Sequence, residues 1–159
     1  LWALEVLAEE GYTIDCSISP IKTWRYGISN CPDEIFYIPE VKITEFPVSP
    51  FKLFNKRIAI GGAYFRIFPY FLTRKGIRER ASNGRPTMFY IHPWEYDPQH
   101  PVVDFHWKAK LTHYTGLTNT IPYTQKLLKD FSFVTVSELV QEYGRTHSLR
   151  NIQLSVLKD

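Results

Sequence analysis

The residues best suited to chemistry lie in one short segment, FYIHPWEYDP at residues 89–98. His92 follows an apolar run, and an imidazole can donate or accept a proton near neutral pH. Trp94 offers a flat face against which a sugar ring can stack. Glu95 could orient His92 or bind a substrate hydroxyl. The alternative is structural: a histidine satisfied by hydrogen bonds and a tryptophan buried in the core.

Two carboxylates in this segment leave a second chemistry open. Glu95 and Asp97 are two residues apart, so on a strand they would face the same side, as in the carboxylate pair of a glycosidase. Pro93 instead favours a loop, in which neighbouring acids are usually solvated. Hydrolysis of a glycosidic bond therefore remains an alternative to chemistry centred on His92.

Local motifs predict neither a metal site nor a nucleophile. The histidine spacings fit neither HxxxH nor HExxH, and only a site assembled by folding is left open. Cys16 and Cys31 form no CxxC or zinc pattern, so one disulfide and two free thiols both fit. The chain has no GxSxG elbow. The five histidines are His92, His100, His106, His113 and His147.

Composition predicts a globular chain of 159 residues, long enough for one domain with a core. Its formal net charge of +3 is too small to predict nucleic-acid binding. Basic residues between positions 74 and 85 are interpreted as the solvated side of a helix. No run reaches the length and apolarity of a membrane span, so no integral membrane segment is predicted.

The first third of the chain predicts a helix–glycine–strand unit followed by a long connection. Residues 1–10 have a helical pattern that ends at Gly11, and residues 12–18 resemble a strand. Because the helical pattern is already under way at Leu1, we expect further sequence upstream. The proline-rich residues 19–50 predict loop with short edge strands. Residues 41–46 and 53–60 are predicted strands.

The middle of the chain predicts the elements that position His92. Residues 64–80 resemble a helix whose regular part starts near Pro69. Residues 87–91 resemble a buried strand of a parallel sheet. The loop after such a strand is where parallel α/β folds place their chemistry, which is where residues 92–106 would lie.

The end of the chain predicts two helices, over residues 122–130 and 137–143, joined by a short strand at 132–136. Thr135 and Glu138 have the spacing of a capping box. We assign residues 1–144 to one domain.

Residues 145–159 are interpreted as a tail of uncertain order. Its alternating apolar residues could add an edge strand: Ile152, Leu154 and Val156.

Five segments occur in an order typical of one family. They are LWALEVLAEEGYTIDCSISP (1–20), GGAYFRIFPYFL (61–72), GRPTMFYIHPWEYDP (84–98), THYTGL (112–117) and LLKDFSFVTVSEL (127–139). Together they resemble the polysaccharide deacetylases of the nodulation-type deacetylase fold, in the subgroup associated with exosortase-linked exopolysaccharide loci. The HPWE and GGxYFR parts are the specific ones.

The resemblance implies an α/β fold, the C-terminal part of a distorted (β/α) barrel with fewer than eight strands. It implies metal-dependent removal of N-acetyl groups from a sugar polymer, with an N-acetylated polysaccharide as partner. The divalent metal, commonly zinc, would be held by an Asp and two His in motifs upstream of Leu1. This chain would then supply no metal ligand and would not turn over alone. The compartment, cytoplasmic or periplasmic, stays open.

The resemblance also assigns site residues. His92 occupies the position of the family's general-acid histidine, which protonates the departing sugar amine. Tyr90 stands where the family has Leu, so the acetyl pocket would be lined differently. Asp15 lies in the earlier strand motif, where Cys16 replaces the usual Ser. The substrate-binding candidates are Tyr90, Trp94, Glu95, Asp15 and Arg66. A non-catalytic carbohydrate-binding or scaffold protein of the same fold is the alternative.

Overall fold

The computed structural model describes residues 1–23, 26–104 and 106–157. The fold is mixed α/β, as predicted, and the chain forms two compact units. The first comprises Leu1–Pro50 with Val134–Asp159, and the second comprises Phe51–Phe133. Each unit has its own cluster of buried apolar side chains.

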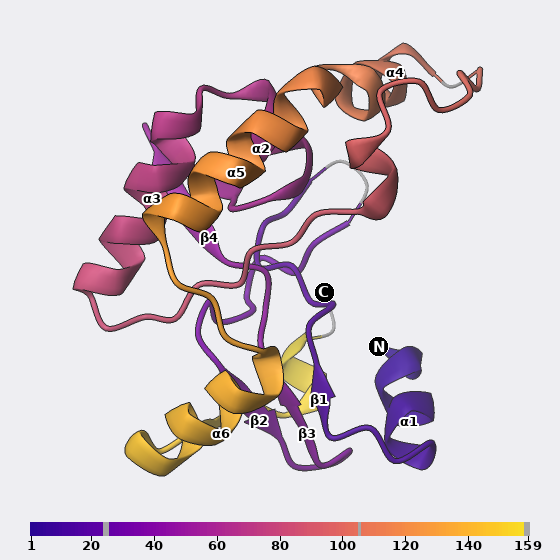
Figure 1. The fold of residues 1–159 in the computed structure, drawn as a ribbon. Coiled ribbons are helices and arrows are strands. Elements are labelled where there is room, and N and C mark those ends of the chain that lie inside the picture. The colour runs from indigo at the N-terminus through magenta and orange to yellow at the C-terminus, as the bar shows by residue number, and fades with distance from the viewer. Residues whose placement is uncertain (24–25, 105, 158–159) are drawn as a thin grey trace. The chain divides into compact units, whose positions relative to one another are not determined.

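The first unit is built on a four-stranded mixed sheet (Figure 1). Its central pair, β2 and β3, is antiparallel, and each central strand has a parallel outer neighbour, β6 and β1 respectively. In sheet order the strands are β1 (Ile14–Asp15), β3 (Ile43–Glu45), β2 (Phe36–Ile38) and β6 (Arg150–Asn151). Its helices are α1 (Trp2–Glu9), α6 (Val136–Thr146) and the 3-10 helix η3 (Leu154–Leu157).

Local signals at helix ends are confirmed in this unit. The N-terminal helix ends before Gly11, which takes the left-handed conformation at φ 83°. Thr135 caps α6 through the predicted reciprocal hydrogen bonds with Glu138.

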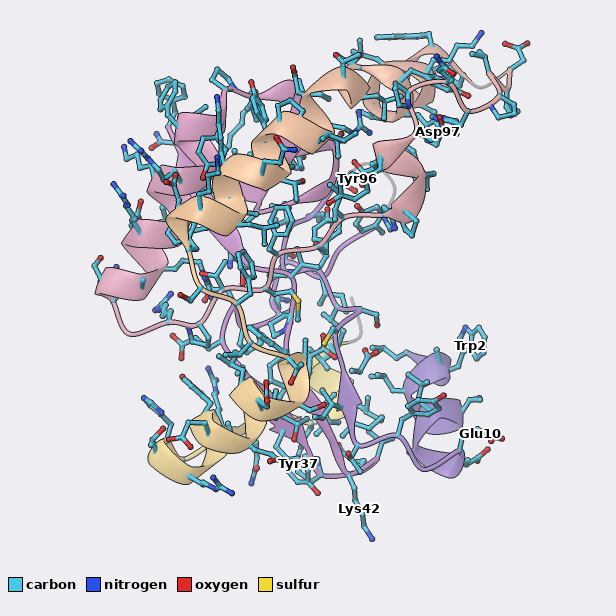
Figure 2. The ribbon with its side chains drawn as sticks, in the orientation of Figure 1. Trp2, Glu10, Tyr37, Lys42, Tyr96 and Asp97 are labelled. Carbon is cyan, nitrogen blue, oxygen red and sulfur yellow. The ribbon has the colours of Figure 1, made fainter. Side chains whose placement is uncertain are left out.

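Long-range pairing in the first unit was predicted less well. The connection over residues 19–50 contributes β2, which is interior and not an edge strand, because the C-terminal segment pairs with it. That segment does form an edge strand, but at Arg150–Asn151, because the chain turns into η3 and buries Leu157 in the core. The predicted strand at residues 132–136 is absent: residues 132–135 belong to no strand, and Val136 already begins α6. Figure 2 shows Lys42 at the turn between β2 and β3, with its side chain pointing away from the sheet.

The second unit is mainly helical and begins with a hairpin. Helices α2, α3 and α5 pack together beside it (Figure 1). Its elements are β4 (Pro50–Leu53), β5 (Lys56–Ala59), α2 (Gly62–Ile67), α3 (Tyr70–Ser82), η1 (Pro93–Tyr96), α4 (Trp107–Tyr114), η2 (Leu117–Asn119) and α5 (Thr120–Asp130).

One predicted strand of this unit is confirmed only in part, and another is wrong. The run 53–60 is split by a turn at Phe54, whose φ of 51° cannot continue a strand, so it forms the end of β4 and all of β5. The run 87–91 is half-buried and forms only one parallel bridge, from Tyr90 to Gly61. The predicted helix break at Pro69 is confirmed, because α2 ends before it and α3 begins after it.

A pair of glycines explains how the segment before His92 is held. The amide of Gly62 donates to the carbonyl of Tyr90 over 2.9 Å. A Cβ at Gly61 would lie 2.2 Å from that same carbonyl oxygen, and Gly61 has a φ of 132°. Only glycine allows this close approach of two backbones, which places His92 at the start of η1. Among the described residues no helix is both long and apolar enough to cross a membrane.

Candidate functional site

A buried ion pair lies at the centre of the candidate site in the second unit. Arg66 of α2 and Glu95 of η1 are joined by a 2.6 Å contact from Nε to Oε2, and each side chain is 1% exposed. The two terminal nitrogens of Arg66 donate to the carbonyls of Thr112 and Thr115 at the end of α4. Arg66 thus ties η1 and the end of α4 to one helix.

The same carboxylate fixes the main chain of His92. Oε1 of Glu95 accepts from the His92 amide over 3.1 Å, and the Glu95 amide donates to the His92 carbonyl over 3.0 Å. This is a capping box at the start of η1, with Pro93 as the first helical residue. Glu95 therefore orients the backbone of His92, not its ring. Both its oxygens are engaged inside the protein, away from solvent.

The imidazole of His92 itself is exposed. Its ring lies 5.9 Å from the ring of Trp94, nearly parallel at 10°, and 6.0 Å from Tyr90 in an edge contact. A main chain held by Glu95 therefore carries an imidazole that is open to solvent.

Trp94 is partly covered by a residue that the local sequence did not single out. The His113 ring stacks on it at 3.9 Å and 16°, and the Arg66 guanidinium lies 5.4 Å from the Trp94 ring centre. His113 comes from α4 and lies in the THYTGL segment of the resemblance, which is the signal that pointed towards it. Stacking against His113 and the guanidinium fixes the plane of the indole.

His113 is also hydrogen-bonded to His100. Nδ1 of His100 lies 2.6 Å from the carbonyl of Asp97, which can only accept, so this nitrogen carries a hydrogen. Nε2 of His100 lies 3.2 Å from Nε2 of His113, and one of these two nitrogens donates to the other. Burial, and next the interactions with His100 and Arg66, lower the pKa of His113.

The residues of this site do not supply a metal centre. Across the described ranges, no three His, Cys, Asp or Glu side chains come together around one point. His100 and His113 meet, but as a hydrogen-bonded pair without a third ligand. No step of a reaction is therefore assigned to a metal held by these residues.

The carboxylate pair considered for glycosidic bonds is not assembled. Glu95 is buried against Arg66, whereas Asp97 is exposed and accepts from the amide of Gln99 over 3.0 Å. The segment is a 3-10 turn and not a strand, and the two acids differ in burial, so they do not form one pair on a shared face. This geometry argues against an acid pair of the kind that cleaves glycosidic bonds.

Asp15 lies in the first unit, next to a buried carboxyl that sequence reasoning missed. Asp15 and Glu45 are register partners on the parallel strands β1 and β3. Glu45 is fully buried; its Oε1 accepts from the Ile18 amide over 3.0 Å, and Oε2 has no hydrogen-bond partner. Burial, and next the neighbouring Asp15, raise the pKa of Glu45 to about 9. Glu45 is therefore protonated at neutral pH.

The same surroundings make Cys16 a poor nucleophile. Burial, and next the charges of Glu45 and Asp15, raise the pKa of its thiol to about 11. Only the thiolate attacks, and almost none exists at neutral pH. Both Cys16 and Cys31 are free thiols.

Glu45→Gln should stabilise the protein at alkaline pH. A raised pKa means that the contribution of Glu45 to stability is complete below its ordinary value of 4.5 and is lost as pH rises towards about 9. Gln is neutral throughout, so the variant should be about 1 to 3 kcal/mol more stable at pH 8, after allowance for one unpaired amide hydrogen. Urea unfolding at pH 5 and pH 8 measures this.

The control for this prediction is Glu142→Gln, an exposed carboxylate of α6. Its stability should follow that of the parent at both pH values. A Glu45→Gln chain that loses stability equally at pH 5 and pH 8 would show that Glu45 is charged in the folded protein.

One protein-family profile matches the chain, that of the domain of unknown function (DUF3473), over residues 16–141. The matched range contains Arg66, Tyr90, His92, Trp94 and Glu95, and it begins one residue after Asp15. No curated protein and no solved structure matches the chain.

Proposed function

The chain belongs to the DUF3473 domain family, and from this premise we propose that it serves the removal of N-acetyl groups from a sugar polymer. The family is known from proteins associated with polysaccharide deacetylases. The order of the chain's motifs resembles that of such enzymes, which supports the same conclusion. In this proposal the chain is the C-terminal part of a distorted (β/α) barrel. The divalent metal, zinc by resemblance, is held by ligands upstream of Leu1.

In this proposal His92 is the proton donor. An amide nitrogen leaves poorly unless it is protonated, so hydrolysis of an acetamide needs an acid beside the departing sugar amine. The observation that carries this assignment is the exposed His92 imidazole on a main chain fixed by buried Glu95. The nucleophilic water and the oxyanion contacts are assigned to the upstream part.

Tyr90 and Trp94 are the proposed substrate-facing rings, because both are partly exposed and lie beside His92. Arg66 and Glu95 act through them as positioning residues. The ion pair holds η1, and Arg66 lies against Trp94. Asp15 keeps a proposed role in substrate binding, with Glu45 as its buried neighbour.

The test is acetate release from N-acetylglucosamine oligomers by the chain joined to its natural upstream sequence. The expected result is release that stops when a chelator removes the metal and resumes when zinc is restored. Glycan binding without acetate release, unchanged by chelator and by His92→Ala, would contradict the proposal and support a carbohydrate-binding module. New reducing ends without acetate would instead indicate cleavage of glycosidic bonds.

A further inference from the structure

A concave site separate from the surroundings of His92 lies in the second unit and is lined by residues of α3 and α5. These two helices pack against each other (Figure 1). The site has a volume of about 490 Å³, within the range of small-ligand sites. It takes no part in the proton donation assigned to His92. The lining residues are Tyr70, Phe71, Arg74, Tyr123, Lys126, Lys129 and Asp130.

The aromatic rings of this pocket are open to a ligand. Phe71 is 59% exposed, although its large apolar ring would normally be covered. Tyr70 and Tyr123 lie beside each other, with ring centres 5.8 Å apart. An exposed phenyl ring next to polar groups suits the mixed surface of a sugar, whose C–H face packs on the ring while its hydroxyls reach polar atoms.

The pocket carries excess positive charge. Its one carboxylate, Asp130, is already engaged: it accepts from the Tyr70 hydroxyl over 2.7 Å and lies 3.9 Å from Arg74. Lys126 lies over the Tyr123 ring at 5.8 Å. Neither Lys126 nor Lys129 has a carboxylate partner among the described residues. Two ammonium groups therefore remain for an anion.

The pocket of the first unit provides a contrast. It has a similar volume of about 570 Å³, but its charged residues are mostly acidic: Glu5, Glu9, Glu40 and Lys42. Positive charge is thus a property of the pocket on α3 and α5, not of every hollow on this chain.

We propose that the pocket on α3 and α5 binds an acidic sugar residue, one that carries a carboxylate, with its ring on Phe71 and its anion on Lys126 and Lys129. The inference rests on the proposed function in one respect, that the ligand is a polysaccharide. It deepens that function by naming the polymer as anionic. The pocket would hold a stretch of the chain away from the reacting acetamide.

The experiment measures binding of an oligoglucuronate, a neutral N-acetylglucosamine oligomer and inorganic phosphate by calorimetry, without any enzymatic readout. The acidic oligomer should bind at least about tenfold more tightly than the neutral one, and more weakly as salt rises. Lys126→Gln with Lys129→Gln should lower its affinity about tenfold or more, and Phe71→Ala should also weaken it. Lys42→Gln, an exposed lysine outside this pocket, is the matched control.

Equal affinity for acidic and neutral oligomers would overturn the inference, as would equal weakening by Lys42→Gln. If phosphate bound as tightly as the acidic oligomer, the pocket would be a general anion site, and the claim that it recognises a sugar would be wrong. Thermal melting checks that the surface variants remain folded, since such changes are usually within about 0.5 kcal/mol. Binding of the acidic oligomer without acetate release would contradict the proposed function but not this inference. Acetate release without preferential binding of the acidic oligomer would contradict this inference but not the proposed function.

Discussion

Replacing His92 with glutamine should slow acetate release from an N-acetylated sugar polymer by about 10²- to 10⁴-fold, the usual contribution of a general acid. Glutamine keeps a polar side chain of similar reach but has no proton to give to the departing amine. The main-chain amide at this position can still donate to Glu95, so this contact and the fold should be retained. Acetate assays on the chain with its upstream sequence measure the rate.

An activated substrate separates proton donation from a general loss of activity. Hydrolysis of nitrophenyl acetate releases a stable nitrophenolate, which needs no proton to leave. The His92→Gln variant should therefore hydrolyse this ester at a rate close to that of the parent. His147→Gln, an exposed histidine beyond α6, should leave both rates unchanged. Equal losses on the amide and the ester would show that His92 is not the acid.

Arg66→Ala should lower the free energy of unfolding by about 3 to 5 kcal/mol, the range expected when one partner of a buried ion pair is removed. The change leaves the Glu95 carboxyl group buried without a counter-ion. It also removes the donors that satisfy the carbonyls of Thr112 and Thr115. Denaturant unfolding followed by tryptophan fluorescence measures the loss.

An exposed ion pair of the same chain gives the comparison. Arg145 and Glu142 lie 3.6 Å apart on α6, with side chains 74% and 68% exposed. Arg145→Ala should change the unfolding free energy by no more than about 1 kcal/mol, because water screens the pair. Similar effects of the two substitutions would mean that Glu95 is not held as a buried charge by Arg66.

Elements marked by one or two decisive residues were predicted correctly from the sequence. Gly11 ends the first helix, Pro69 separates α2 from α3, and Thr135 with Glu138 starts α6. In each case the signal is local, because the backbone conformation or the cap depends on neighbouring residues alone. The strand predicted over residues 53–60 is interrupted at Phe54, and this break was not predicted because nothing in the composition marks Phe54 as a residue of positive φ.

The candidate site was predictable only where its residues are close in sequence. Tyr90, His92 and Trp94 lie in one short segment that the sequence marks as the candidate site, and their rings are neighbours in the structure. The ion pair from Arg66 to Glu95 spans 29 residues, and the stacking of His113 on Trp94 depends on where α4 ends. Such contacts depend on how helices pack against each other, and the spacing of residues along the sequence does not predict them.

Glu45 illustrates the same limit in the first unit. An acid at the end of an apolar strand is usually assumed to be solvated, since ionised carboxylates are rarely buried. Here the parallel register with β1 sets it beside Asp15 in the interior, which only the strand pairing reveals.

The two oxygens of the Glu95 carboxylate make two different contacts: one binds Arg66 of α2, and the other accepts from the main-chain amide of His92. Any change that pulls η1 away from α2 must break the contact between Glu95 and Arg66. The contact with the His92 amide lies inside the turn itself, so His92 is expected to move with Glu95 as one piece. Substitutions at Arg66 are therefore expected to displace the His92 imidazole and to loosen the second unit together, whereas substitutions at His92 leave the ion pair in place.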